Sequence, residues 1–160
     1  MLTTPNFLDF MNQALLFFEL NLSIDSINGY SLALKRIKLD SHYIHFRSFP
    51  WGWATWENRW NLNHFDKKKI NQIIQKYPKL LYDFKSDNGN DVVKMLKRTL
   101  KGEISSWYIR WVFNNYLSGK KSLFPATSKV ENIGYGPQAT HYSGGISAYK
   151  TITDKSYLRK

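Results

Sequence analysis

The sequence predicts an α/β fold that is rich in helices and has only a few short strands. Four segments carry apolar residues at the three- and four-residue spacing of a buried helix face. Two other segments have the β-branched and aromatic residues typical of short strands. So small a sheet offers little surface for four helices to cover. We therefore expect a mostly helical fold, or one whose larger sheet is completed by sequence upstream of residue 1.

The first helix is expected to begin at Thr4 and Pro5 and to lead into a strand. Threonine is a good helix cap, and proline is tolerated in the first turn because its missing N–H has no helical partner there. Six apolar residues then recur at helical spacing and are expected to form one buried stripe: Phe7, Leu8, Met11, Ala14, Leu15 and Phe18. Asn21 ends this pattern, and residues 23–28 are expected to form a strand that stops at Gly29.

A second extended segment and a second helix follow in the middle of the chain. The aromatic residues of 42–49 predict a strand, which Pro50 ends. Residues 66–77 predict a helix that Asp66 caps and Pro78 terminates. Its apolar residues are Ile70, Ile73, Ile74 and Tyr77.

Two further helices are expected before the pattern is lost. Residues 88–90 form a predicted turn, and Asn90 or Asp91 should cap a helix that runs to about residue 100. Residues 104–116 predict another helix, with Gly119 just past its end in a natural capping position. Helical periodicity then disappears from residue 122 onward, through a glycine-rich loop to a polar tail.

Composition narrows the function classes. The 160 residues include 23 Lys and Arg against 12 Asp and Glu, a net charge of +11 with a pI of about 9.8. Such a charge suits an anionic partner, which includes nucleic acid, a nucleotide or phospholipid headgroups. Since there is no Cys, a disulfide scaffold, a zinc ribbon and a thiol nucleophile are excluded. No stretch reaches the ~20 uninterrupted apolar residues of a membrane span.

The most distinctive feature is a tryptophan-rich segment at residues 51–60. Indole rings stack well on sugar rings and nucleobases, and Gly52 would let a ligand or another backbone come close. Trp53, Trp56 and Trp60 also follow an i, i+3, i+7 spacing, which favours a role as core anchors. Both interpretations remain open from the sequence.

This segment resembles a known family signature. Trp-Gly-Trp-Ala-Thr-Trp at 51–56 is similar to the signature of bacterial sugar transferases that are related to the N-acetylglucosaminyltransferase I type and have the GT-A fold. Further family motifs are matched in the same order along residues 3–142. They are Thr-Pro-Asn-Phe-Leu-Asp-Phe-Met-Asn at 4–12, Ser-Ile-Asn-Gly-Tyr at 26–30, Ser-Trp-Tyr-Ile-Arg-Trp at 106–111, and a closing stretch with Pro125, 132–134 and 140–141.

The resemblance implies the C-terminal half of a GT-A domain. Residues 1–145 would be the acceptor-side part, and residues 146–160 a flexible tail. In the family, a Glu-Asp-Asp motif of the Asp-x-Asp type precedes the helix that matches residues 4–12. It holds the divalent metal ion, Mn²⁺ or Mg²⁺, that bridges the donor diphosphate. Met1 and Leu2 stand where that motif should just have ended, so we expect this chain alone to be inactive.

The family also implies a carboxylate base that deprotonates the acceptor hydroxyl in an inverting, single-displacement transfer. Animal relatives carry an acidic pair just before the tryptophan that matches Trp107, but this chain has Ser105 and Ser106 there. Glu103, one helical turn before Trp107, and Glu57 are the remaining candidates. A solvated surface carboxylate explains each of them equally well.

Further residues are implied as substrate ligands. The glycine-rich loop 134–145 resembles the family loop that closes over the nucleotide diphosphate, although an ordinary surface loop has the same composition. An arginine beside the matched tryptophans would face an anionic ligand or pair with a carboxylate of its own domain. The expected substrate-binding residues are Trp51, Gly52, Trp53, Trp107, Arg110, Thr140 and His141, with no metal ligands in this chain.

The expected parent enzyme transfers a hexosyl or N-acetylhexosaminyl group from a nucleotide sugar to a saccharide or lipid-linked acceptor in the synthesis of cell-surface polysaccharide. We expect it in the cytoplasm, with peripheral association at the inner face of the membrane, since a basic surface attracts anionic headgroups. A small basic, aromatic-rich module that binds nucleic acid or carbohydrate is the main alternative, with nucleic acid the less favoured partner. An inactive truncated product is the third.

Overall fold

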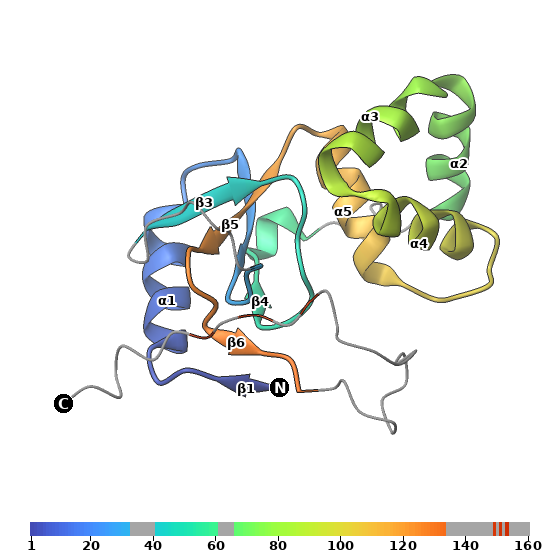
Figure 1. The fold of residues 1–160 in the computed structure, drawn as a ribbon. Helices are drawn as coiled ribbons and strands as arrows, with labels where there is room; N and C mark the ends of the chain where they lie inside the picture. The colour runs from blue at the N-terminus through green and yellow to red at the C-terminus, as the bar shows by residue number, and fades with distance from the viewer. Residues whose placement is uncertain (33–40, 61–65, 134–148, 150, 152, 154–160) are drawn as a thin grey trace.

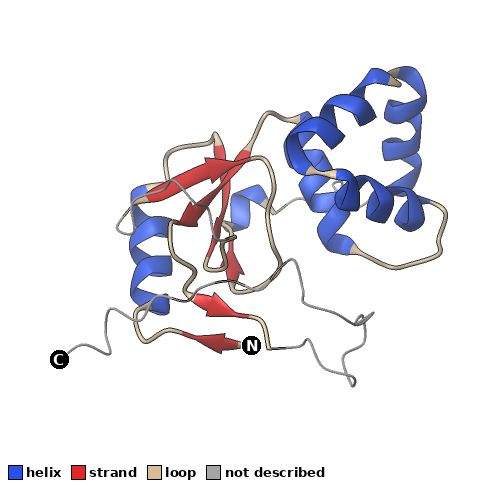
Figure 2. Ribbon diagram, viewed as in Figure 1, coloured by secondary structure: helices blue, strands red, loops and turns tan. Residues whose placement is uncertain are grey.

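The computed structural model describes residues 1–32, 41–60, 66–133, 149, 151 and 153. These residues form a mixed α/β fold with five α-helices, one 3₁₀ helix and six strands in two small sheets. Figures 1 and 2 show two neighbouring units, a sheet unit that includes α1 and a helical unit of α2 to α5. The elements in chain order are β1 (Leu2–Thr3), α1 (Phe7–Phe17), β2 (Ile24–Asn28), β3 (His42–His45), β4 (Trp53–Ala54), η1 (Glu57–Arg59), α2 (Lys67–Lys76), α3 (Lys79–Asn88), α4 (Asn90–Leu100), α5 (Trp107–Leu117), β5 (Lys121–Pro125) and β6 (Val130–Glu131).

The larger sheet has the strand order β3-β5-β2-β4. β2 and β5 run parallel in its centre, and the two outer strands are antiparallel to their neighbours. β5 therefore enlarges the sheet beyond what the sequence predicts. Its residues 122–125 are all buried, so the strand lacks the alternation of apolar and polar residues that marks a one-sided strand.

Helix α1 covers the four-stranded sheet and closes a small core around Met11, Ala14 and Ile27. The predicted strand at 23–28 is confirmed as β2, and the helix begins two residues after Pro5. The predicted stripe is wrong at Leu8, which is 66% exposed. The residues next to the N-terminus form β1, which pairs with β6 in a separate two-stranded sheet.

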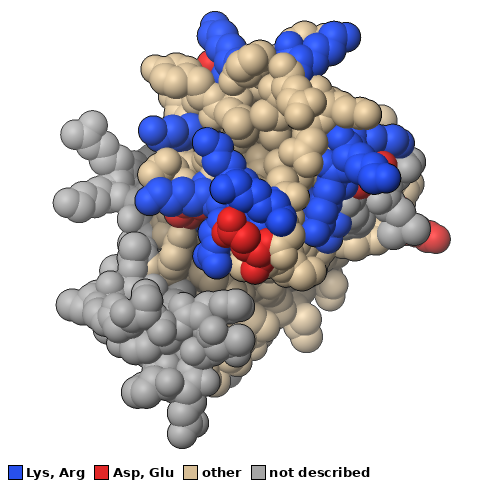
Figure 3. Space-filling view, turned by 90° about the vertical axis from the view of Figure 1, so that its right-hand side faces the viewer, with Lys and Arg blue, Asp and Glu red and all other residues tan. Residues whose placement is uncertain are grey.

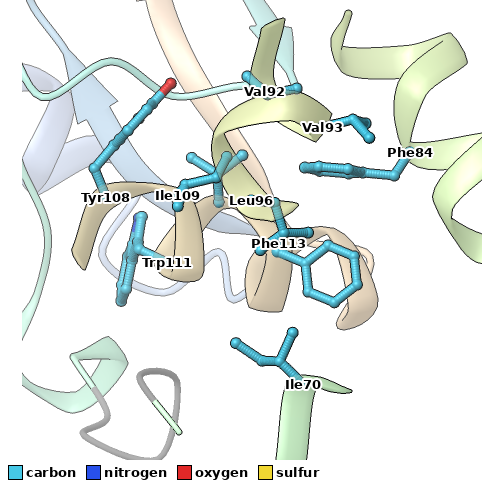
Figure 4. Close-up of a cluster of buried hydrophobic side chains, with 10 residues drawn as sticks. Ile70, Phe84, Val92, Val93, Leu96, Tyr108, Ile109, Trp111 and Phe113 are labelled. Carbon is cyan, nitrogen blue, oxygen red and sulfur yellow. The ribbon is translucent and has the colours of Figure 1, made fainter. Parts of the chain in front are cut away.

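The helical unit has its own hydrophobic core, shown in Figure 4. Phe84 of α3 contacts Phe113 of α5 edge-to-face, with ring centroids 5.1 Å apart. Ile70 of α2 and Leu96 of α4 complete the same cluster. Because residues from all four helices share this core, their amphipathic faces need no sheet to pack against.

The predicted helices depart from the structure at three further points, of which the first is that α5 begins at Trp107 and not at residue 104. The sequence pattern does not predict α3, because Pro78 is typical of a terminator, whereas its αR backbone makes it the N-cap of the next helix. α4 begins at Asn90 with Gly89 as its N-cap, so neither Asn90 nor Asp91 has that role. The predicted Asp66 cap is confirmed, since its side chain accepts the backbone N–H groups of Lys68 and Lys69 at 2.8 and 3.2 Å.

Candidate functional site

Four tryptophans that are widely separated in the sequence meet between the sheet unit and the helical unit. We call Trp53, Trp60, Trp107 and Trp111 the tryptophan cluster. Trp53 is 5.9 Å from Trp60, 5.3 Å from Trp107 and 5.9 Å from Trp111, measured between ring centroids. Trp60 is 5.8 Å from Trp107 and 5.1 Å from Trp111. These separations are those of directly packed aromatic rings.

Short local structures bring the four rings together. Trp53 is held at the sheet edge, where β4 pairs with β2 and Trp53 lies opposite Asn28. The 3₁₀ turn of η1 then returns the chain, so that Trp60 follows it directly. Trp107 and Trp111 are four residues apart on α5 and therefore share one helix face.

The cluster has a buried floor and an accessible rim. Trp111 is 1% exposed, whereas Trp60 and Trp107 are each 39% exposed and meet at an interplanar angle of 63°. An apolar ring supported from below and open to water on one side suits stacking against the apolar face of a ligand ring. Trp53 and Trp107 are predicted substrate residues that the structure brings into contact.

Glu57 is the better placed of the two predicted carboxylates. It begins η1, and its backbone carbonyl accepts the Trp60 N–H at 3.1 Å. Its side chain is exposed, and no residue in the described part of the chain forms an ion pair or hydrogen bond with that carboxylate. Such a carboxylate can accept a proton from a bound hydroxyl without first breaking another interaction.

Glu103 is engaged in surface ion pairs. Its carboxylate lies 3.3 Å from the Arg98 Nε and 3.8 Å from the Lys101 Nζ. It precedes Trp107 by four residues in the loop between α4 and α5. Exposed pairs of this kind hold a side chain only weakly, yet they favour the surface interpretation for Glu103.

Arg110 lies on α5 beside the cluster and is half-buried. Its Nε donates to the carbonyl of Ser106 at 3.1 Å, and its own carbonyl accepts from Asn114 Nδ2 at 2.8 Å. This arrangement fixes the guanidinium near the start of the helix that carries Trp107 and Trp111.

Trp51 and Gly52 lie in a different part of the sheet unit. Trp51 packs against Tyr30, Phe49 and Tyr149, with ring centroids 4.8, 5.6 and 5.6 Å away. The Gly52 carbonyl accepts the Gly29 N–H at 2.7 Å, and its φ of +60° favours glycine. The structure therefore gives both residues packing contacts. Thr140 and His141 lie outside the described residues.

The remaining tryptophan of the segment anchors α1. The Trp56 Nε1 donates to the Leu15 carbonyl at 3.2 Å, and the Arg59 guanidinium lies 3.4 Å over the Trp56 ring centroid. Arg59 also donates to the carbonyls of Ile24 and Phe18 at 2.7 and 3.2 Å. Trp56 thus faces α1 and not the other tryptophans, so the i, i+3, i+7 spacing does not reflect one common face.

A polar network that the sequence patterns do not predict joins the two units. Arg47 makes a two-point contact with Asp91 of α4, at 2.6 and 3.2 Å, and donates to the Asn88 carbonyl at 3.0 Å. The Tyr149 hydroxyl donates to the same Asp91 carboxylate at 2.6 Å. Burial alone would raise the pKa of Asp91, but the hydrogen bonds from Arg47 and Tyr149 outweigh it and lower that pKa below its usual value. No local motif signals this network, since its members are 44 and 58 residues apart.

Neither a metal cluster nor a membrane span is found in the part of the chain that the structure describes. Its His, Asp and Glu side chains do not gather in groups of three or more that could hold a metal ion. None of its helices has the length and apolar character needed to cross a bilayer.

Comparison with known proteins gives no neighbour from which a function could be transferred. No family model, no curated protein and no solved structure matches this chain. What the structure establishes is the mixed α/β architecture and the geometry of its side chains.

Proposed function

We propose that this chain is the acceptor-side part of a GT-A glycosyltransferase and that the tryptophan cluster binds the saccharide acceptor. The observation that carries the proposal is the partly exposed pair Trp60 and Trp107, which packs on Trp53, while Trp60 also packs on the buried Trp111. Pyranose rings present apolar C–H faces that complement indole rings. The motif resemblance supports the same class of ligand, and its motifs at 51–56 and 106–111 contain Trp53, Trp107 and Trp111 of the cluster.

Glu57 is the favoured base in this proposal. In an inverting transfer, the carboxylate takes the proton of an acceptor hydroxyl as that oxygen forms a bond to the anomeric carbon of the donor. The bond between the anomeric carbon and the diphosphate oxygen breaks, and the nucleoside diphosphate leaves with the electron pair. Glu57 supports this role because its carboxylate is exposed and makes no ion pair or hydrogen bond with the described residues, and its backbone carbonyl accepts the Trp60 N–H.

Exposed apolar side chains at and just after the C-terminal end of α1 support the idea of a second, donor-binding part. Leu16, Phe17 and Leu20 are 76%, 80% and 93% exposed. Exposed apolar side chains that lie this close together commonly mark a contact surface. In the proposed enzyme, these three side chains pack against the part that holds the nucleotide sugar.

The experiment that tests acceptor binding is a calorimetric titration with a panel of hexose and N-acetylhexosamine disaccharides. The double variant Trp60→Ala/Trp107→Ala is expected to weaken binding about tenfold or more, because buried aromatic contacts dominate recognition. The control Tyr82→Ala removes another aromatic side chain, 72% exposed, from helix α3 and should leave binding unchanged. Equal losses in both variants, or none in the double variant, would reject the cluster as the acceptor site.

A further inference from the structure

The positive charge of the molecule is concentrated on the helical unit. Residues 67–117 contain eleven Lys and Arg against four Asp and Glu, a net charge of +7 out of +11 for the whole chain. Figure 3 looks onto this unit and shows blue basic side chains spread over its surface, with acidic ones confined to small areas. The unit therefore presents a positive field toward any anionic surface that it approaches.

Lysine supplies most of this charge, and acidic residues in the described part of the chain neutralise little of it. Nine of the eleven basic residues are Lys. Among the residues that the structure describes, Lys101 is the one lysine of the helical unit in an ion pair, with Glu103 at 3.8 Å. Arg98 pairs with the same carboxylate, and Arg110 is hydrogen-bonded to Ser106. Lysines outside ion pairs attract negative charge of any arrangement. Arginine, in contrast, has a fixed planar geometry by which it recognises individual bases and phosphates.

The corner between α2 and α3 combines lysines with exposed aromatic rings. Lys76, Tyr77 and Lys79 flank Pro78, and all four residues are exposed. Tyr77 is 54% exposed and Tyr82 is 72% exposed, while the Lys76 Nζ lies 5.3 Å from the Tyr77 ring centroid. Tyrosines with an apolar ring and a polar tip favour the boundary between lipid and water, where lysines can reach the headgroups.

We propose that the helical unit binds the surface of an anionic phospholipid bilayer through this α2–α3 corner. The corner forms the outer end of the helical unit, away from the four-stranded sheet (Figure 1), so it is placed to meet a flat surface. Binding is peripheral and electrostatic, with the two tyrosines at the level of the headgroups. The inference goes beyond the proposed transferase role and does not depend on it.

Vesicle sedimentation tests the proposal with the intact chain and no sugar present. The vesicles contain phosphatidylcholine, with or without about 30% phosphatidylserine, at about 0.1 M salt. We expect binding only to the anionic vesicles. The variant Lys76→Gln/Lys79→Gln should weaken it about 25-fold, since each lysine near the surface contributes about fivefold, equivalent to ~1 kcal/mol. The control Lys121→Gln/Lys129→Gln removes the same charge from the sheet unit and should weaken binding less than about threefold.

Each other outcome contradicts the proposal. No binding to anionic vesicles, or equal binding to neutral ones, rules out an anionic lipid surface as the partner. If the two double variants lose vesicle binding equally, the net charge of the chain drives binding and the α2–α3 corner has no special role. A parallel titration with a single-stranded oligonucleotide completes the test. If the chain binds the oligonucleotide more tightly than the anionic vesicles, and Lys76→Gln/Lys79→Gln abolishes that binding, the surface is assigned to nucleic acid. Acceptor binding is measured in a separate experiment. A lack of vesicle binding therefore does not contradict the transferase proposal, and a lack of saccharide binding does not contradict the membrane proposal.

Discussion

Trp56 and Trp60 are four residues apart in the sequence, yet they have different tasks. Trp56 lies under the Arg59 guanidinium and donates to the Leu15 carbonyl, so it holds the end of α1. Trp60 forms the accessible rim of the tryptophan cluster and is 39% exposed. At the scale of single residues, the tryptophan-rich segment therefore divides into structural positions and candidate binding positions.

This division predicts different stability effects for the two tryptophans. Trp56→Ala should lower the free energy of unfolding by about 2–4 kcal/mol, because it removes a cation–π contact, a hydrogen bond and core packing. Trp60→Ala should cost about 1 kcal/mol, since much of that ring is already in water. Urea denaturation of both variants measures the difference, and a larger loss for Trp60→Ala contradicts the assignment.

The different surroundings of Glu57 and Glu103 predict different effects of substituting each candidate base. In the proposed full-length glycosyltransferase, Glu57→Gln should lower kcat by about 10²–10⁴, the contribution of a general base, with little change in the acceptor KM. Glu103→Gln serves as the control and should leave kcat within about threefold, because its surface ion pairs contribute little. Steady-state kinetics with a nucleotide sugar provides the measurement. A large loss of kcat in Glu103→Gln, with none in Glu57→Gln, would assign the role of base to Glu103.

Among the structural elements, β4 depends on a close approach at Gly52. A Cβ atom at this position would lie 2.7 Å from the Val130 Cγ2, and the backbone φ is +60°. Gly52→Ala is expected to lower the free energy of unfolding by more than about 2 kcal/mol, since steric overlap adds to backbone strain.

Gly102 provides the matched control for this substitution. Its φ is +81°, but a Cβ atom at this position would meet no other atom within 4 Å among the described residues. Gly102→Ala therefore carries only the backbone cost of about 1–2 kcal/mol. Thermal denaturation of both variants isolates the steric part, and equal losses would show that Val130 does not constrain the turn at Gly52.

The Arg47–Asp91 contact joins the loop after β3 to the start of α4. Asp91→Asn should lower the free energy of unfolding at pH 7 by about 1 kcal/mol, a value reduced for the 44% exposure of the carboxylate. Because the folded-state pKa of Asp91 lies below its unfolded value of about 3.9, the unfolded chain binds the proton more readily. The stabilisation is therefore present above about pH 4 and is lost as the pH falls through the folded-state pKa.

Urea midpoints at pH 7 and about pH 3 test this dependence. The gap between the wild-type chain and Asp91→Asn should shrink at the lower pH. Asp66→Asn is the control, since asparagine caps a helix nearly as well as aspartate, and it should stay close to the wild type at neutral pH. A gap between the wild-type chain and Asp91→Asn that is independent of pH contradicts the role of the Asp91 charge.

Sequence patterns predict the elements whose signals are local and miss those that depend on distant partners. α2 is predicted well because its cap, apolar face and terminating proline lie within a dozen residues. α3 is missed because Pro78 ends one helix and caps the next. β5 is missed because its place between β3 and β2 buries it on both sides, which removes the alternating pattern.

At the scale of the whole molecule, the candidate site lies where the two units meet. Sequence motifs single out Trp53 and Trp107, but their contact depends on η1 turning the chain and α5 docking against the sheet unit. Trp111 is missed as the floor of the site, since its helical spacing is equally typical of a core residue. The two units also differ in charge, because +7 of the net charge of +11 lies on the helical unit.

The most direct test of acceptor binding is the indole N–H spectrum of the ¹⁵N-labelled chain during titration with the disaccharide panel. The six tryptophans give separate probes of the cluster and of the structural positions. We predict saturable shifts for Trp60 and Trp107, with the signals of Trp51 and Trp56 unchanged. An unchanged spectrum with every disaccharide, or shifts confined to Trp51 and Trp56, would contradict the assignment of the tryptophan cluster as the saccharide-binding surface.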